Sequence, residues 1–268
     1  MGKYNVHAGH NPANKVACGA VGLINESTEN RNVAKELIKI LREQGHTVYD
    51  CTVDNGVSAS DIINKIVTKA NTNTVDLDIS IHFNSGAKDV KGNGSTTGVE
   101  VLVYKTGGES EVVAKRICNK VSNLGFKNRG VKVRTDLGYL KRTKAPVALL
   151  VECAFVDDYD DTSLYNYEKM ALAIAEGILN KTIELNKVTE STYYRVVAGS
   201  FTKRDNAQKV VNDLKNKNYS AFIDIYKTTE NTYYRVVAGS YSKIENAQNT
   251  VDNLRGEGFS AFIDIYKK

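Results

Sequence analysis

The stretch Ile79-Ser-Ile-His-Phe-Asn-Ser85 predicts the strand around which the rest of the chain is organised. Apolar and polar residues alternate along it, which is the period-two pattern of a β-strand. It follows a polar turn at residues 71–78 and precedes a glycine-rich loop at residues 86–98. His82 is therefore expected at the end of a strand, just before a loop, where α/β proteins place their functional sites.

Strand and helix patterns alternate on both sides of this stretch. Further strands are expected at residues 3–8, 47–52, 98–104 and 146–151. Helices are expected from Ser27 or Thr28 to residue 43, and at residues 60–70, 109–124 and 160–179, whereas the basic segment 129–143 reads as loop with short strand pieces. This alternation predicts an α/β fold class, a mostly parallel twisted sheet flanked by helices, in a domain covering residues 1–181.

The rest of the chain is a repeat with a period of 40 residues. Residues 189–227 and 229–267 are identical at 25 of 39 aligned positions, and each unit reads as strand, helix and strand. A single unit of this size can hardly bury a core, but two units packed together can. We therefore predict a small α+β domain over residues 189–268, built from two βαβ repeats that form a four-stranded sheet with two helices.

Composition limits the classes of function. The chain has 268 residues, 41% hydrophobic and 25% charged, which are ordinary globular values. No apolar run approaches the roughly 18 residues of a membrane span, and the N-terminus has no hydrophobic signal core. We expect no membrane insertion, and synthesis in the cytoplasm. The net charge of +5 is mild and suits an anionic surface, and no nucleic-acid partner is expected.

His82 has three candidate partners far away in the sequence. His10 lies in a His-Ala-Gly-His segment, Glu26 precedes the first expected helix, and Glu152 directly follows the apolar run 146–151. Two imidazoles and a carboxylate are a common catalytic zinc set, and a further carboxylate can then act as general base. A carboxylate at the end of a buried strand is costly unless it has a partner or a task. His7 competes with His10, since both are expected in one short loop.

The order of these residues resembles that of the zinc-dependent N-acetylmuramoyl-L-alanine amidases of the amidase-3 family. That family has a Gly-His after its first strand, a Glu before its first helix, a Ser-x-His-x-Asn segment and a late Pro-x-x-Leu-x-Glu-x-x-Phe. The corresponding residues are Gly9-His10, Glu26, Ser80–Asn84 and, with one extra residue, Pro146–Phe155. The family often has Asp where His7 stands. The resemblance implies Zn²⁺ held by His10, Glu26 and His82, with Glu152 as the catalytic carboxylate.

The repeat is similar to the SPOR family of peptidoglycan-binding domains. The similar stretches are Tyr194–Phe201 with Asn206-Ala207, and Tyr234–Tyr241 with Asn246-Ala247. This resemblance implies peptidoglycan as a wall anchor. Exposed tyrosines suit such a ligand, because each offers a flat apolar ring with a polar tip.

Together the two resemblances imply a peptidoglycan hydrolase that cleaves the amide bond between N-acetylmuramic acid and L-alanine. Asn84 and Arg142 are candidate substrate residues, and Arg142 is expected to stabilise the oxyanion. We expect a phage endolysin that acts on the wall after release. The alternatives are a bacterial mother-cell lytic amidase, a zinc peptidase acting on the stem peptide, and a wall-binding protein with a decayed enzyme domain.

Overall fold

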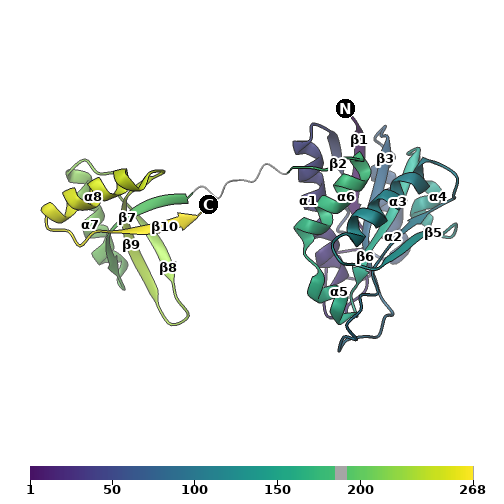
Figure 1. The fold of residues 1–268 in the computed structure, drawn as a ribbon, viewed down its shortest axis with the longest axis horizontal. Helices are drawn as coiled ribbons and strands as arrows, with labels where there is room; N and C mark the ends of the chain where they lie inside the picture. The colour runs from purple at the N-terminus through teal and green to yellow at the C-terminus, as the bar shows by residue number, and fades with distance from the viewer. Residues whose placement is uncertain (185–191, 268) are drawn as a thin grey trace. The chain divides into compact units, whose positions relative to one another are not determined.

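The computed structural model describes residues 1–184 and 192–267. These residues fall into two compact units, the first of which ends at residue 183 (Figure 1). The first predicted domain boundary, residue 181, lies close to the end of the first unit, whereas the second, residue 189, lies outside the described residues. Within the described part of the chain, no helix has the length and apolar character that crossing a membrane requires.

A six-stranded sheet with the order β2-β1-β3-β6-β4-β5 forms the centre of the first unit. The strands are β1 (Lys3–Ala8), β2 (Thr47–Asp50), β3 (Leu77–Asn84), β4 (Val99–Val103), β5 (Asn128–Val133) and β6 (Val147–Phe155). Neighbouring strands run parallel, apart from the antiparallel pair β4 and β6. The predicted fold class, a mostly parallel sheet flanked by helices, is confirmed.

The two faces of this sheet are covered by different helices. On one face, α1 (Glu26–Glu43), α3 (Glu109–Ser122) and α6 (Tyr167–Leu179) pack on strand residues such as Ile81 and Val151. On the other face, α2 (Ala59–Ala70) and the five-residue α4 (Gly138–Arg142) pack over Leu102, Ala148 and Leu150. Because side chains alternate along a strand, residue 152 shares the second face with residues 148 and 150.

Three local predictions were wrong in detail. Helix α1 begins at Glu26, because Asn25 rather than Ser27 or Thr28 caps it by accepting the N–H of Thr28. The expected helix 160–179 is two helices, α5 (Tyr159–Leu164) and α6, because Asn166 caps α6. The segment 129–143, expected to be loop with short strand pieces, contains most of the short strand β5 but also the helix α4, which was not expected.

The second unit is a four-stranded antiparallel sheet with the order β10-β7-β9-β8, covered by two helices, as predicted. Its elements are β7 (Thr192–Phe201), α7 (Arg204–Asn216), β8 (Phe222–Lys227), β9 (Thr232–Tyr241), α8 (Ile244–Gly256) and β10 (Phe262–Lys267). The last strand of each repeat pairs with the first strand of the other: β8 with β9, and β10 with β7. The two repeats therefore form a single interlocked sheet.

Candidate active site

The central strands place His82 and Glu152 next to each other. In the register of β3 and β6, His82 is the partner of Glu152, and across the antiparallel pair Glu100 is the partner of Glu152. A row of polar side chains therefore crosses the sheet near the carboxyl ends of β3 and β6. The edge at which parallel strands end is where α/β proteins bind ligands.

His10 joins this row from the loop after β1. Its Nε2 lies 3.3 Å from Glu26 Oε1, and His82 Nδ1 lies 3.0 Å from the same oxygen. One ligand atom from each of the three residues falls within 4.8 Å of the others. The structure thus brings together the three residues that were predicted as metal ligands.

The Glu26 carboxylate is held in place by the backbone. The N–H groups of Ala20 and Phe83 donate to its two oxygens, at 2.7 and 3.2 Å. Burial alone would raise the pKa of Glu26, but the hydrogen bonds and charges of His10 and His82 outweigh it, so this pKa lies well below its usual range. Burial lowers the pKa of His82, which favours the neutral imidazole that binds metals.

We call His10, Glu26 and His82 the trio. Two glycines leave room for the side chains of the trio. A Cβ added at Gly9 would lie 2.1 Å from His82 Nε2, and one at Gly19 would lie 2.5 Å from Glu26 Oε2. Two ring nitrogens and a carboxylate oxygen that converge in this way fit a divalent metal ion of the zinc type.

His7 lies elsewhere. It belongs to β1 itself rather than to the following loop, and its side chain is buried. Ser80 Oγ lies 3.2 Å from its Nδ1, and its Nε2 lies 3.6 Å from Asp78 Oδ1. The competing first-loop histidine is therefore not part of the trio.

Glu152 is the carboxylate next to His82 in the register of the sheet. Its Oε2 is buried and accepts no hydrogen bond from the described residues. Burial, and then the charges of Glu26 and Glu100, raise the pKa of Glu152 to about 8, against a smaller opposing effect of Arg134. A carboxyl group whose pKa lies near neutrality is suited to accept and return a proton.

The other two predicted site residues have different surroundings. Asn84 Nδ2 donates to Glu100 Oε1 at 2.9 Å, and Arg129 Nε donates to the other oxygen at 2.8 Å, so Asn84 positions the carboxylate next to Glu152. Arg142 donates to Asn64 Oδ1 and to the Gly138 carbonyl, and it is not among the residues that line the cavity described next. Its expected oxyanion role has no support in this geometry.

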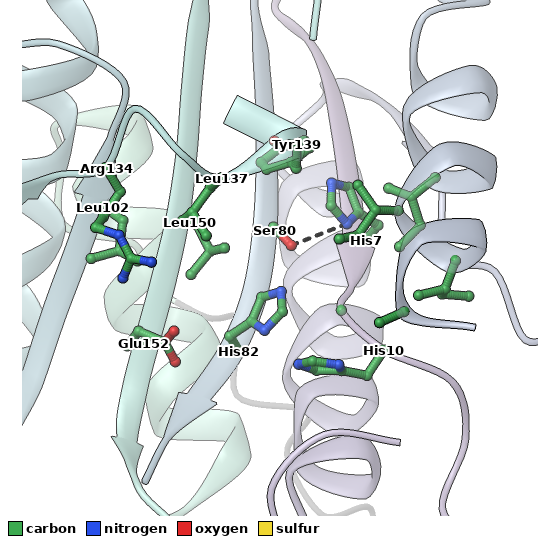
Figure 2. Close-up of a pocket in the computed structure, with 16 residues that line it drawn as sticks. His7, His10, Ser80, His82, Leu102, Arg134, Leu137, Tyr139, Leu150 and Glu152 are labelled. Atoms are coloured by element: carbon green, nitrogen blue, oxygen red, sulfur yellow. Dashed lines mark hydrogen bonds between the residues drawn. The ribbon is translucent and has the colours of Figure 1, made fainter. Parts of the chain in front are cut away.

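A cavity of about 250 Å³ opens beside Glu152, between the sheet and the helices α2 and α4. Figure 2 shows Glu152, His82 and His10 at one end of it, with Leu150, Leu102, Leu137 and Arg134 on one side and His7, Ser80 and Tyr139 on the other. Arg134, from the segment after β5, is the basic residue that sequence reasoning missed. The sequence shows that the segment 129–143 is basic, but only the fold shows which of its arginines reaches the cavity.

A second set of carboxylates holds the glycine-rich loop after β3. Asp160 Oδ2 accepts the N–H groups of Asn93, Gly94 and Ser95, and Asp157 accepts those of Gly86, Ala87 and Lys88. Sequence reasoning missed this role, although the run Asp157-Asp158-Tyr159-Asp160-Asp161 was a visible signal.

Residues 5–183 match the family model described as N-acetylmuramoyl-L-alanine amidase. The chain belongs to this amidase family. Residues 190–264 match the SPOR domain, so an amidase-family domain is followed by a SPOR domain.

Several known proteins are similar to this chain. An uncharacterised protein of Clostridium perfringens is 36% identical over 228 residues, 79% of this chain and 65% of that protein. The sporulation-specific N-acetylmuramoyl-L-alanine amidase of Bacillus subtilis is 26% identical over 226 residues, 81% of each chain. The solved catalytic domain of the CD27L endolysin, which targets Clostridia difficile, is 30% identical with a TM-score of 0.61, and the match covers 69% of this chain and all of that domain.

The chain is shorter than the first relatives that it matches. It spans 65% and 53% of the lengths of two proteins from Clostridium perfringens.

Proposed function

We propose that this chain is a zinc-dependent peptidoglycan hydrolase that cleaves the amide bond between N-acetylmuramic acid and L-alanine. The observation that carries the proposal is the convergence of His10, Glu26 and His82 next to Glu152, in a chain of the amidase family. In this proposal, Nε2 of His10, Nδ1 of His82 and Oε1 of Glu26 would hold the ion.

A bound zinc ion supplies Lewis acidity to the scissile carbonyl and lowers the pKa of water. Glu152 takes a proton from the attacking water and later delivers it to the leaving amine. Its burial and raised pKa suit both steps, because the group is a usable base and a usable acid near neutral pH. Asn84 and Arg129 hold Glu100 in place, which keeps a fixed negative charge beside Glu152.

The SPOR domain is proposed to hold the enzyme on peptidoglycan. Tethering a second wall-binding module raises the effective concentration of the active site at its substrate. The matched family model over residues 190–264 supports this role.

We propose a phage endolysin as the biological setting, because the related CD27L catalytic domain is an endolysin at 30% identity. The alternative is a bacterial mother-cell lytic amidase, favoured by the match to the sporulation-specific amidase over 81% of both chains. A neighbouring holin gene would support the endolysin, and transcription confined to sporulation would support the alternative.

The test of the activity is digestion of purified peptidoglycan before and after metal removal. Dialysis against a chelator should abolish the fall in turbidity, and added zinc should restore it. Glu152→Gln should retain zinc but lose roughly 10²–10⁴ in rate, since the amide cannot accept a proton. A zinc-loaded wild-type protein that leaves peptidoglycan intact would refute the proposal and support a decayed enzyme domain.

A further inference from the structure

We call His82, Glu152 and Glu100, which lie side by side on β3, β6 and β4, the catalytic row. The floor of the cavity is a second row of side chains, adjacent to the catalytic row on the same three strands. Ser80, Leu150 and Leu102 are register neighbours on β3, β6 and β4. Each lies two residues from His82, Glu152 or Glu100 on its own strand, a spacing of about 6–7 Å. Because the period of a strand is two, the second row faces the same side of the sheet as the catalytic row. When a substrate is bound at Glu152, a group only a few bonds from the reacting atoms therefore reaches the second row.

Apolar side chains make up much of the rest of the enclosure. The α2 residues Ile62, Ile63 and Ile66 and the α4-adjacent Leu137 line the cavity together with Leu150 and Leu102. An apolar cavity of about 150 Å³ binds benzene, and this one is about 250 Å³. It is much larger than one methyl group requires.

Two of the polar residues that line the cavity, Ser80 and Arg134, bond to neighbouring side chains, whereas Tyr139 Oη and His7 Nε2 have no hydrogen-bond partner among the described residues. On the β1 side, Ser80 and His7 are 3.2 Å apart and hydrogen-bonded to each other (Figure 2). Arg134 donates twice to Asp136, with both contacts at 2.8 Å. The part of the cavity next to Leu150, Leu102 and Leu137 suits an apolar group because its lining there is mainly apolar, and Glu152 is the one carboxylate among the described residues that line the cavity.

The position of Glu152 indicates which part of the substrate enters. The carboxyl group that protonates the leaving amine must lie next to that nitrogen. Leu150 lies directly behind Glu152 on β6, and Leu102 lies beside Leu150 on β4. The leaving nitrogen is bonded to the Cα of an amino acid. The side chain on that Cα is thus the group with direct access to the apolar part of the cavity.

We propose that this cavity is the subsite for the side chain of the amino acid whose amino group is released, and that it accepts apolar side chains larger than the methyl group of alanine. The inference rests on the proposed amide hydrolysis and adds to it the residues that determine specificity. Leu150, Leu102 and Leu137 would contact the side chain, with Ile62, Ile63 and Ile66 closing over it.

The test compares three synthetic substrates, N-acetylmuramoyl-L-alanine, N-acetylmuramoyl-L-leucine and N-acetylmuramoyl-L-lysine amides, with the zinc-loaded full chain. The leucine compound should have a kcat/KM at least equal to that of the alanine compound, and the lysine compound should fall at least tenfold below leucine. Rejection of leucine by tenfold or more relative to alanine would overturn the proposed subsite. If none of the three is hydrolysed, the proposed reaction fails instead.

A variant that fills the cavity tests whether the relative kcat/KM for the leucine and alanine substrates is determined at this site. Leu150→Phe should lower the leucine-to-alanine ratio of kcat/KM at least tenfold. Val112→Phe, at a residue that is 47% exposed on α3, is the matched control and should leave the ratio unchanged. Equal loss of both substrates in Leu150→Phe would contradict the proposal.

A binding measurement that needs no catalysis completes the test. Toluene should raise the melting temperature of the wild-type chain, and Leu150→Phe should abolish this shift. If toluene has no effect on the wild type, the cavity does not take apolar groups and the proposal is wrong.

Discussion

His10 has a left-handed backbone conformation, with a φ of 62°, directly after Gly9. A non-glycine residue rarely adopts this conformation, and such residues are concentrated at functional sites. Here the turn directs the imidazole toward Glu26, while the missing Cβ of Gly9 leaves room for His82. The first ligand is thus defined by backbone geometry as much as by residue type.

Removing either histidine of the trio should remove the metal, because two protein ligands seldom hold a catalytic zinc. We expect His10→Ala and His82→Ala to lose bound zinc, measured by elemental analysis of the purified protein. His7→Ala is the control and should retain zinc, since His7 contacts Ser80 and lies near Asp78 instead. Full zinc in His10→Ala, with loss in His7→Ala, would show that the first ligand is His7.

The pKa of Glu152 predicts how the stability of the metal-free protein depends on pH. Its folded value of about 8 exceeds the ordinary 4.5, so the folded state retains a proton that the unfolded state releases. The free energy of unfolding should therefore fall as the pH rises from about 4.5 to 8, by at most about 1.4 kcal/mol per pH unit from this group.

Glu152→Gln removes this titration. In urea unfolding at a series of pH values, the metal-free variant should become progressively more stable than the metal-free wild type between about pH 4.5 and 8. The difference should stay constant outside that window. A difference that does not change with pH would mean that Glu152 is ionised in the folded protein at neutral pH.

At the scale of elements, the strands β3 and β6 were predicted in type and place, but β6 was expected to end at residue 151 and continues to Phe155, so Glu152 lies within the strand. The uniform apolar run before Glu152 indicates a strand that is buried on both faces, as β6 is. The alternation of residues 79–84 does not show that Ser80 is also buried, because helices cover both faces of the sheet. Helix starts were less predictable, because Asn25, Ser27 and Thr28 are all good capping residues and only the hydrogen bond to the N–H of Thr28 distinguishes them.

The trio and Glu152 were predicted from four separate segments through a family resemblance, and the fold brings them together. The expected strand at residues 3–8 matches β1 and contains His7, so the strand pattern already favoured His10 as the residue of the following loop. The choice between Arg134 and Arg142, by contrast, depended on tertiary structure. Both lie in one basic segment, yet one lines the cavity and the other bonds to Asn64 on α2.

The glycine-rich loop after β3 depends on Asp160. Its Oδ2 accepts three successive N–H groups, from Asn93, Gly94 and Ser95. We expect Asp160→Ala to speed amide hydrogen exchange at these residues and to cost about 1–3 kcal/mol of stability. Val90→Ala, at an exposed residue of the same loop, is the control. Unchanged exchange in Asp160→Ala would mean that other contacts hold the loop.

At the scale of the whole molecule, the second unit is stabilised by contacts that cross between its repeats. Arg195 lies 3.4 Å from the ring centroid of Tyr266, and Arg235 lies 3.5 Å from that of Tyr226. Each pair joins a residue of one repeat to a tyrosine of the other. In addition, β8 pairs with β9 and β10 pairs with β7, so each repeat supplies a strand to the first strand of the other repeat. One repeat is therefore incomplete without the other.

Cutting the second unit at Thr228 should therefore leave no stable monomeric half. Residues 184–268 should melt cooperatively, whereas each half should either be unfolded or form a dimer, because the repeats are alike enough to replace one another. Circular dichroism melts combined with light scattering would distinguish these outcomes. A half that is monomeric and melts cooperatively would show that the repeats are independent domains.

The proposed enzyme hydrolyses the bond between the lactyl group of N-acetylmuramic acid and L-alanine. Mass spectrometry of peptidoglycan digested by the zinc-loaded protein tests this reaction most directly. We expect stem peptides that begin with a free L-alanine amino group, glycan strands with free lactyl carboxylates, and neither product with Glu152→Gln. Products cut within the stem peptide, with L-alanine still attached to the glycan, would contradict it and identify a peptidase.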